Sequence, residues 1–168
     1  AVKSVGRHKG ASDNDEQYKI AEMSVNDLGF AFNNKELFRR IKMKLATLKE
    51  EDKPAPDFTA WSLNGKKVKL SDFRGKVVYV DFWATNCAPC VAELPHIRKL
   101  QDKFKDKDVV FLYVSFDNSK ELLKKFIAEK AFSGIHLIDE KGLASDIAMK
   151  YRIEGIPTHI LVSKKGIL

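Results

Sequence analysis

The chain has 168 residues, of which 44% are hydrophobic and 32% charged, and its formal net charge is +7. This composition supports a buried core, and the absence of any run of about 18 apolar residues excludes a predicted membrane span. The positive charge is spread along the chain, with +2 over residues 1–53 and +5 over the rest. No basic block is interleaved with aromatic residues, so no nucleic-acid partner is predicted.

Residues 1–53 are predicted to form an N-terminal tail and helical segment. Residues 1–15 are polar and are typical of a mobile tail, and residues 16–32 show weak helical spacing. Residues 34–50 form an amphipathic pattern that begins at a capping box of Asn33 and Glu36. The apolar face of this helix is expected to pack on the following domain, on a partner or on further chain, with a membrane-surface role as the alternative.

A domain boundary is predicted at residues 51–56, where Pro54 and Pro56 stop the helix. The second domain then covers residues 54–168. It opens with two short apolar runs, 58–61 and 68–70, on either side of Asn64-Gly65. Asn-Gly between such runs predicts a β-hairpin.

Beyond the hairpin, strand and helix patterns alternate. Strands are predicted at 77–83, 109–116, 136–138 and 158–162, and helices at 88–105, 119–131 and 145–151, the second with Ser119 as its N-cap. The alternation predicts an α/β fold with a largely parallel sheet. Because the chain stops at Leu168, straight after a turn-like segment, a further strand is expected to be cut off.

The two cysteines of the chain, Cys87 and Cys90, lie three residues apart, where the strand 77–83 leads into a helix. So small a loop constrains the unfolded chain little, so the spacing favours redox chemistry or metal ligation over a structural staple. A four-ligand metal site needs two further ligands, and the four histidines make no recognisable pair. No metal or cofactor is therefore predicted, and a static disulfide remains the alternative.

The position of Cys87 at a helix N-terminus predicts a reactive thiolate, because free N–H groups and the helix dipole stabilise negative charge there. Pro89 suits the first helical turn, where no N–H is needed. Cys90, one turn further along, is expected to be less exposed and to resolve a mixed disulfide formed on Cys87.

Two carboxylates and a proline complete the candidate site. Asp81 lies within the buried strand, where burial should raise its pKa and let it exchange a proton with Cys90. Glu93 follows Cys90 by three residues on the same helix face and could hold or relay that proton. The alternatives are a merely hydrogen-bonded Asp81 and a solvated Glu93. Pro157 precedes the last strand, in either a cis bond or a trans turn.

Together these motifs resemble the thioredoxin superfamily, and most closely its TlpA/ResA-like thiol–disulfide oxidoreductases. The resemblance covers about residues 54–168 and rests on the order and spacing of six segments: Pro54-Ala55-Pro56-Asp57-Phe58-Thr59, Leu70-Ser71-Asp72-Phe73-Arg74-Gly75-Lys76, Val80-Asp81-Phe82-Trp83-Ala84, Cys87-Ala88-Pro89-Cys90, Glu93-Leu94-Pro95 and Gly155-Ile156-Pro157-Thr158. It implies a thioredoxin-like fold with an N-terminal β-hairpin extension and with the last strand and helix of the core missing.

The resemblance also implies roles. Cys87 matches the attacking and Cys90 the resolving cysteine, Asp81 the buried carboxylate, Glu93 the acidic residue of the TlpA/ResA-like group and Pro157 the cis-proline. A substrate-contacting surface is implied at Trp83, Asn86, Ala88, Pro89, Ile156 and Pro157. Asn86 departs from the tryptophan that many relatives carry before the first cysteine, which alters the surface next to Cys87.

The implied activity is a protein-disulfide reductase that works with a reducing partner protein, outside the cytoplasm, with any membrane anchor lying outside this chain. Two other functions are weighed. A peroxidase of the same fold usually needs Pro and Thr shortly before its cysteine, and residues 83–86 lack that arrangement. A metal-carrying or binding module is the alternative from a different class. The residues fix neither the direction of the redox reaction nor the oligomeric state.

Overall fold

The computed structural model describes residues 53–168. The predicted tail and helices before Lys53 lie outside the described residues, and the division into two domains stays a prediction. None of the helices described from Lys53 onward has the length and apolar character needed to cross a membrane.

The domain is built on one six-stranded sheet. Its strands are β1 (Thr59–Ser62), β2 (Lys67–Lys69), β3 (Val77–Trp83), β4 (Val109–Ser115), β5 (Ile135–Ile138) and β6 (Thr158–Val162), arranged in the order β2-β1-β5-β4-β3-β6. Strands β3, β4 and β5 run parallel to one another. Strand β1 pairs antiparallel with β5, and β6 pairs antiparallel with β3. The predicted parallel core is therefore confirmed.

The predicted hairpin joins β1 and β2 at the edge of this sheet. Its turn is closed by a hydrogen bond from the Ser62 N–H to the Lys66 carbonyl oxygen, at 2.8 Å. Gly65 has a φ of +81° there, which a residue without a side chain adopts most readily. This is the reason that Asn-Gly predicted the hairpin correctly.

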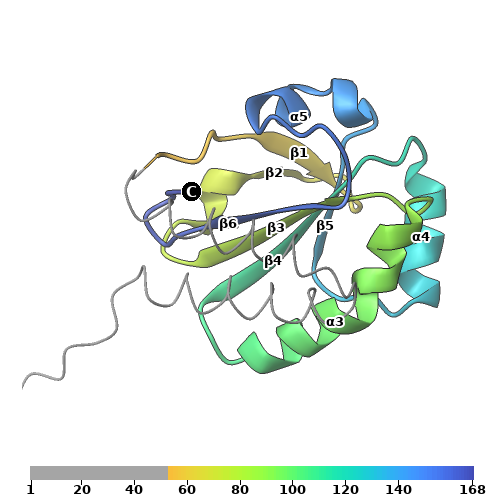
Figure 1. The fold of residues 1–168 in the computed structure, drawn as a ribbon, viewed down its shortest axis with the longest axis horizontal. Helices are drawn as coiled ribbons and strands as arrows, with labels where there is room; N and C mark the ends of the chain where they lie inside the picture. Colours follow the sequence, from red (N-terminus) through yellow and green to blue (C-terminus); the bar gives the residue numbers. More distant parts are fainter. Residues whose placement is uncertain (1–52) are drawn as a thin grey trace, which may run out of the picture.

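Helices cover both faces of the sheet. Figure 1 shows α3 (Ala88–Phe104) and α4 (Lys120–Glu129) on one side and α5 (Asp146–Lys150) on the other. Two short 3-10 helices, η1 (Leu70–Phe73) and η2 (Gly142–Ala144), complete the described elements. Helix α4 begins as predicted, because the Ser119 hydroxyl accepts a hydrogen bond from the Leu122 N–H at 3.3 Å.

Strand β3 is buried along its whole length, and its two faces pack in different hydrophobic clusters. Val78, Val80 and Phe82 pack in a cluster that includes residues of α5. Trp83 packs in a second cluster with residues of α3 and α4. Because side chains alternate along a strand, Asp81 faces the α3 side, under the helix that starts at the cysteines.

Candidate active site

The two cysteines form a disulfide at the start of α3. Cys87 is the N-cap of the helix, and its Sγ accepts a hydrogen bond from the Cys90 N–H at 3.3 Å. Cys87 is half-buried, whereas Cys90 is only 3% exposed. A partner can therefore reach the first sulfur and not the second, which is the asymmetry that an attacking and a resolving cysteine require.

Asp117, which follows β4, fixes the loop that leads to Cys87. Its carboxylate accepts hydrogen bonds from the Thr85 N–H at 3.1 Å and from the Thr85 hydroxyl at 2.6 Å. It also accepts one from the Ser115 hydroxyl at 2.6 Å. The sequence analysis did not identify this clamp. A polar residue just beyond the carboxyl end of the neighbouring parallel strand was the available signal.

The loop before β6 lies over the same part of the core as the disulfide. The peptide bond between Ile156 and Pro157 is cis, and the Thr158 hydroxyl donates a hydrogen bond to the Gly155 carbonyl oxygen at 2.6 Å. Ile156 and Cys87 both pack against the buried cluster that contains Cys90. The fold thus brings together two segments that are about seventy residues apart in the sequence.

Three ionisable side chains meet between the sheet and α3: two buried carboxylates and His159, whose side chain is 20% exposed. Asp81 on β3 and Glu93 on α3 are 3% and 4% exposed. The Nε2 atom of His159, on β6, lies 3.4 Å from Oδ1 of Asp81 and 3.1 Å from Oε2 of Glu93. His159 and Asp81 are direct partners in the antiparallel β3–β6 ladder, so their side chains leave the sheet on the same face.

Burial and charge shift the pKa values within this group. Burial raises the pKa of Asp81 to about 6, with a further rise from the charge of Glu93, while His159 acts in the opposite direction. Burial alone would lower the pKa of His159, but Asp81 and Glu93 together hold it above its ordinary value. A buried carboxyl group that titrates near neutrality is suited to proton exchange.

The sequence analysis named both carboxylates but gave His159 no role. The structure brings Asp81 and Glu93 to the same atom, Nε2 of His159. The solvated alternative for Glu93 is excluded by its burial. The available signal for His159 was its position two residues after Pro157, at the start of a strand that pairs with β3 when it runs antiparallel to it.

The predicted contact residues fall into two groups. Asn86, Ala88 and Pro89 are exposed around Cys87, and Ile156 and Pro157 are half-buried. Trp83 is only 1% exposed, and its ring packs against Phe126 and Phe132 with centroids 5.6 and 5.4 Å apart. That position supports the disulfide from within the core and does not support a direct contact with substrate.

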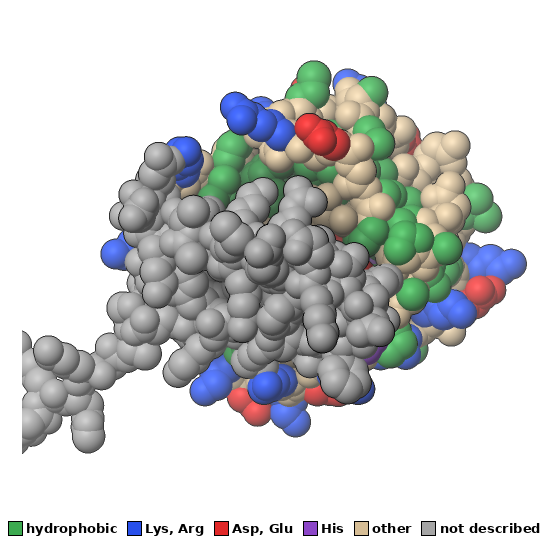
Figure 2. Space-filling view, in the orientation of Figure 1, with side chains coloured by type: hydrophobic (Ala, Val, Ile, Leu, Met, Phe, Trp, Pro, Cys, Tyr) green, Lys and Arg blue, Asp and Glu red, His purple; other side chains and the backbone are tan. Residues whose placement is uncertain are grey.

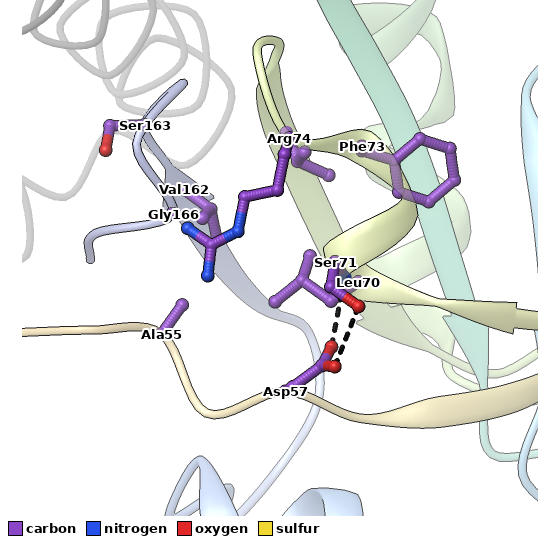
Figure 3. Close-up of a pocket in the computed structure, with 10 residues that line it drawn as sticks. Ala55, Asp57, Leu70, Ser71, Phe73, Arg74, Val162, Ser163 and Gly166 are labelled. Atoms are coloured by element: carbon purple, nitrogen blue, oxygen red, sulfur yellow. Dashed lines mark hydrogen bonds between the residues drawn. The ribbon is translucent and has the colours of Figure 1, made fainter.

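No group of three or more His, Cys, Asp or Glu within residues 53–168 is arranged to hold a metal ion. A small pocket lies at the opposite end of the sheet, between η1 and the end of β6 (Figure 3). Its polar groups bind one another. Asp57 accepts hydrogen bonds from the Ser71 N–H and hydroxyl, and Arg74 donates to the Lys165 carbonyl oxygen. These hydrogen bonds join η1 to the segment before β1 and to the turn after β6. The pocket is separate from the disulfide.

The profile of the redoxin family matches residues 50–168. The chain belongs to the redoxin family. It is 35% identical to the thiol–disulfide oxidoreductase ResA of Bacillus thuringiensis subsp. konkukian, over 70% of this chain and 66% of that protein. It is also 35% identical to the thioredoxin-like protein YneN of Bacillus subtilis, over 71% of this chain and 69% of that protein.

Solved structures agree with this assignment. The thioredoxin domain of a thiol–disulfide oxidoreductase from Bacteroides vulgatus superimposes with a TM-score of 0.64 at 37% identity, over 70% of this chain and 84% of that one. The resemblance to the TlpA/ResA-like group and the thioredoxin-like fold are therefore confirmed. Residues 53–168 lie within the matched redoxin-family region, and the chain spans just under two thirds of the length of the ResA relative.

Proposed function

We propose that this protein reduces the disulfides of other proteins through its Cys87–Cys90 pair. The observation that carries the proposal is the asymmetry of the pair: the half-buried Cys87 caps α3, and the buried Cys90 lies one turn behind it in a redoxin domain. A redox-inert staple would not need one sulfur within reach of a partner.

The reaction begins with the reduced protein. The Cys87 thiolate attacks one sulfur of the substrate disulfide, forms a mixed disulfide and expels the other substrate sulfur as a thiolate. Cys90 then loses its proton and attacks the Cys87 sulfur. The Cys87–Cys90 disulfide forms and the second substrate sulfur leaves. The substrate gains two electrons and two protons, which a reducing partner protein later restores to the pair.

Asp81 and Glu93 would serve the second step. Cys90 is buried, so its proton needs an acceptor within the protein. Asp81 faces the α3 side of the sheet, and its pKa of about 6 leaves it ionised at neutral pH and able to take a proton. Glu93, one turn after Cys90 on α3, sets the local charge together with it.

The surface around Cys87 supports a protein substrate. Asn86, Ala88 and Pro89 are exposed there, and the Ile156–Pro157 loop would pair with substrate backbone, as the resemblance implies. Large apolar side chains are also exposed: Leu122 lies in the first turn of α4, beyond β4, and Leu143 follows β5, at the carboxyl edge of the sheet. Figure 2 shows hydrophobic side chains gathered on the part of the surface where α4 and α5 lie. Apolar surface of this kind favours a polypeptide partner.

Family resemblance also supports a place outside the cytoplasm, a dedicated reducing partner and an anchor to a membrane outside the described domain. Each of these is part of the proposal. A thiol-reducing protein in an oxidising compartment needs its electrons from a donor, because no reducing pool regenerates it there.

The test uses the full chain and three proteins: wild type, C87S and C90S. We expect the reduced wild type to reduce a model protein disulfide, C87S to be inactive and C90S to accumulate a mixed disulfide visible by mass spectrometry. The potential of the pair, measured in graded redox buffers, should lie at or below about −220 mV. A potential near about −120 mV would identify a disulfide donor and overturn the reductase proposal. An active C87S protein would overturn the mechanism.

A further inference from the structure

One nitrogen atom of His159 lies close to two buried carboxylates. Nε2 lies 3.1 Å from Glu93 and 3.4 Å from Asp81, and both carboxylates are almost fully buried. An imidazole nitrogen carries one hydrogen, so it cannot hydrogen-bond fully to both oxygens. Its main effect on the pair is therefore its charge, which offsets one of two negative charges held in a medium of low dielectric.

Within residues 53–168, strand β3 and helix α3 contribute the groups that face His159. Strand β3 contributes Asp81 and the ring of Tyr79, which stacks on the imidazole with centroids 5.5 Å apart. Helix α3 contributes Glu93. No other charged residue occurs in β6. Beyond Asp81, β4 contributes Tyr113, which burial keeps neutral by raising its pKa and whose hydroxyl accepts a hydrogen bond from Gln101 at 3.0 Å.

We infer that His159 is a positioning residue of the disulfide centre, whose positive charge next to Asp81 favours the ionised form of that carboxyl group, so that Asp81 can accept the Cys90 proton at neutral pH. The inference rests on the proposed function and adds a residue to it. Without the imidazolium, burial and the charge of Glu93 would act on Asp81 unopposed, and Asp81 would already hold the proton that it must receive.

The first test measures the charge of Asp81 directly. The ¹³C chemical shift of its side-chain carboxyl, followed against pH in the oxidised full chain, gives its titration midpoint. In H159Q we expect this midpoint to rise by about one pH unit or more. In H159Q/E93Q the repulsion is also removed, and the midpoint should return towards the wild-type value. H96Q is the matched control, because His96 lies on α3 outside the group and should change nothing.

The second test measures the step that Asp81 serves. The release of the second substrate thiol, followed in a single turnover, should slow in H159Q at neutral pH, and the rising limb of its pH profile should move with the Asp81 midpoint. A second variant, H159N, keeps the inference testable if H159Q does not fold, because it also removes the imidazolium and should raise the Asp81 midpoint.

An unchanged Asp81 midpoint in H159Q, or in H159N if H159Q does not fold, would overturn the inference. So would a shifted midpoint with an unshifted rate profile, and in that case the reductase assignment would stand. The proposed function would fail separately if the wild-type protein reduced no disulfide while the Asp81 midpoint of H159Q still differed from that of the wild type.

Discussion

The backbone N–H of Cys90 points at the sulfur of Cys87, with N and Sγ 3.3 Å apart. In the reduced protein this donor and the N-terminus of α3 would stabilise a thiolate on Cys87 more than on Cys90. We expect Cys87 to react with iodoacetamide with a pH midpoint at least about one unit below the ordinary thiol value of about 8.5.

The measurement follows alkylation of C90S against pH by mass spectrometry, with C87S as the matched control that reports the buried thiol. Cys90 should react more slowly and with a higher midpoint, since it is almost fully buried. Equal midpoints for the two thiols would remove the basis for assigning Cys87 as the attacking residue.

The Asp117 clamp on Thr85 predicts a loss of stability when it is removed. The D117A variant leaves the Thr85 N–H and hydroxyl and the Ser115 hydroxyl without their acceptor. We expect the free energy of unfolding to fall by about 2–3 kcal/mol, as for buried hydrogen bonds to a charged group. Urea unfolding measures it, with D102A on the exposed side of α3 as the control, which should change by less than about 0.5 kcal/mol. Equal effects would show that the clamp does not stabilise the loop.

Asp81 makes the stability of the protein depend on pH. Its folded pKa of about 6 lies above the ordinary value of 3.8, so the folded state binds the proton more tightly than the unfolded chain. This contribution to stability is fully present below pH 3.8 and is lost as the pH rises through about 6. The raised pKa of His159 acts in the same direction above its ordinary value of 6.5.

D81N removes the cost of the buried charge. The difference between about 6 and 3.8 corresponds to about 3 kcal/mol at most. We therefore expect D81N to be more stable than wild type at pH 8, by up to that amount, and to match it within about 0.5 kcal/mol near pH 3.5. Denaturant unfolding at both pH values decides this. A variant that is less stable at pH 8 would mean that the Asp81 charge is fully compensated.

Gly134 is predicted to tolerate no side chain. Its φ is +127°, and a Cβ atom there would meet the buried ring of Tyr113. G134A should lose about 2–4 kcal/mol of stability, from backbone strain and overpacking together. G65A is the matched comparison: its φ is +81° but its surroundings are open, so it should lose about 1 kcal/mol. Equal losses in thermal unfolding would show that the Tyr113 ring moves aside at little cost.

Much of this architecture could be predicted because it is encoded locally. The apolar run 77–83 became the fully buried β3, Asn64-Gly65 became a hairpin turn, and Ser119 capped α4. Each depends on residues within a few positions of one another. The parallel core followed from the alternation of strands with helices, because crossover connections join parallel strands.

What could not be predicted depends on strand register and on contacts between distant segments. His159 meets Asp81 only because β6 runs antiparallel to β3 in a particular register, and a slip of one residue would turn the imidazole to the other face. Asp117 binds Thr85 across a gap of 32 residues. The family resemblance implied that Trp83 contacts substrate, whereas the pleat of β3 turns its ring into the core.

Pro157 and His159 are two residues apart on one side of the domain, in the segment that begins β6. A polypeptide that pairs with the loop at Ile156 would therefore press on the same short stretch of backbone that carries the imidazole. Under the proposed mechanism, a single residue separates the loop that would contact a partner from the imidazole next to the proton-accepting Asp81. A partner that fits this loop tightly would therefore change the thiol–disulfide exchange at the cysteines, and a partner that fits it loosely would not.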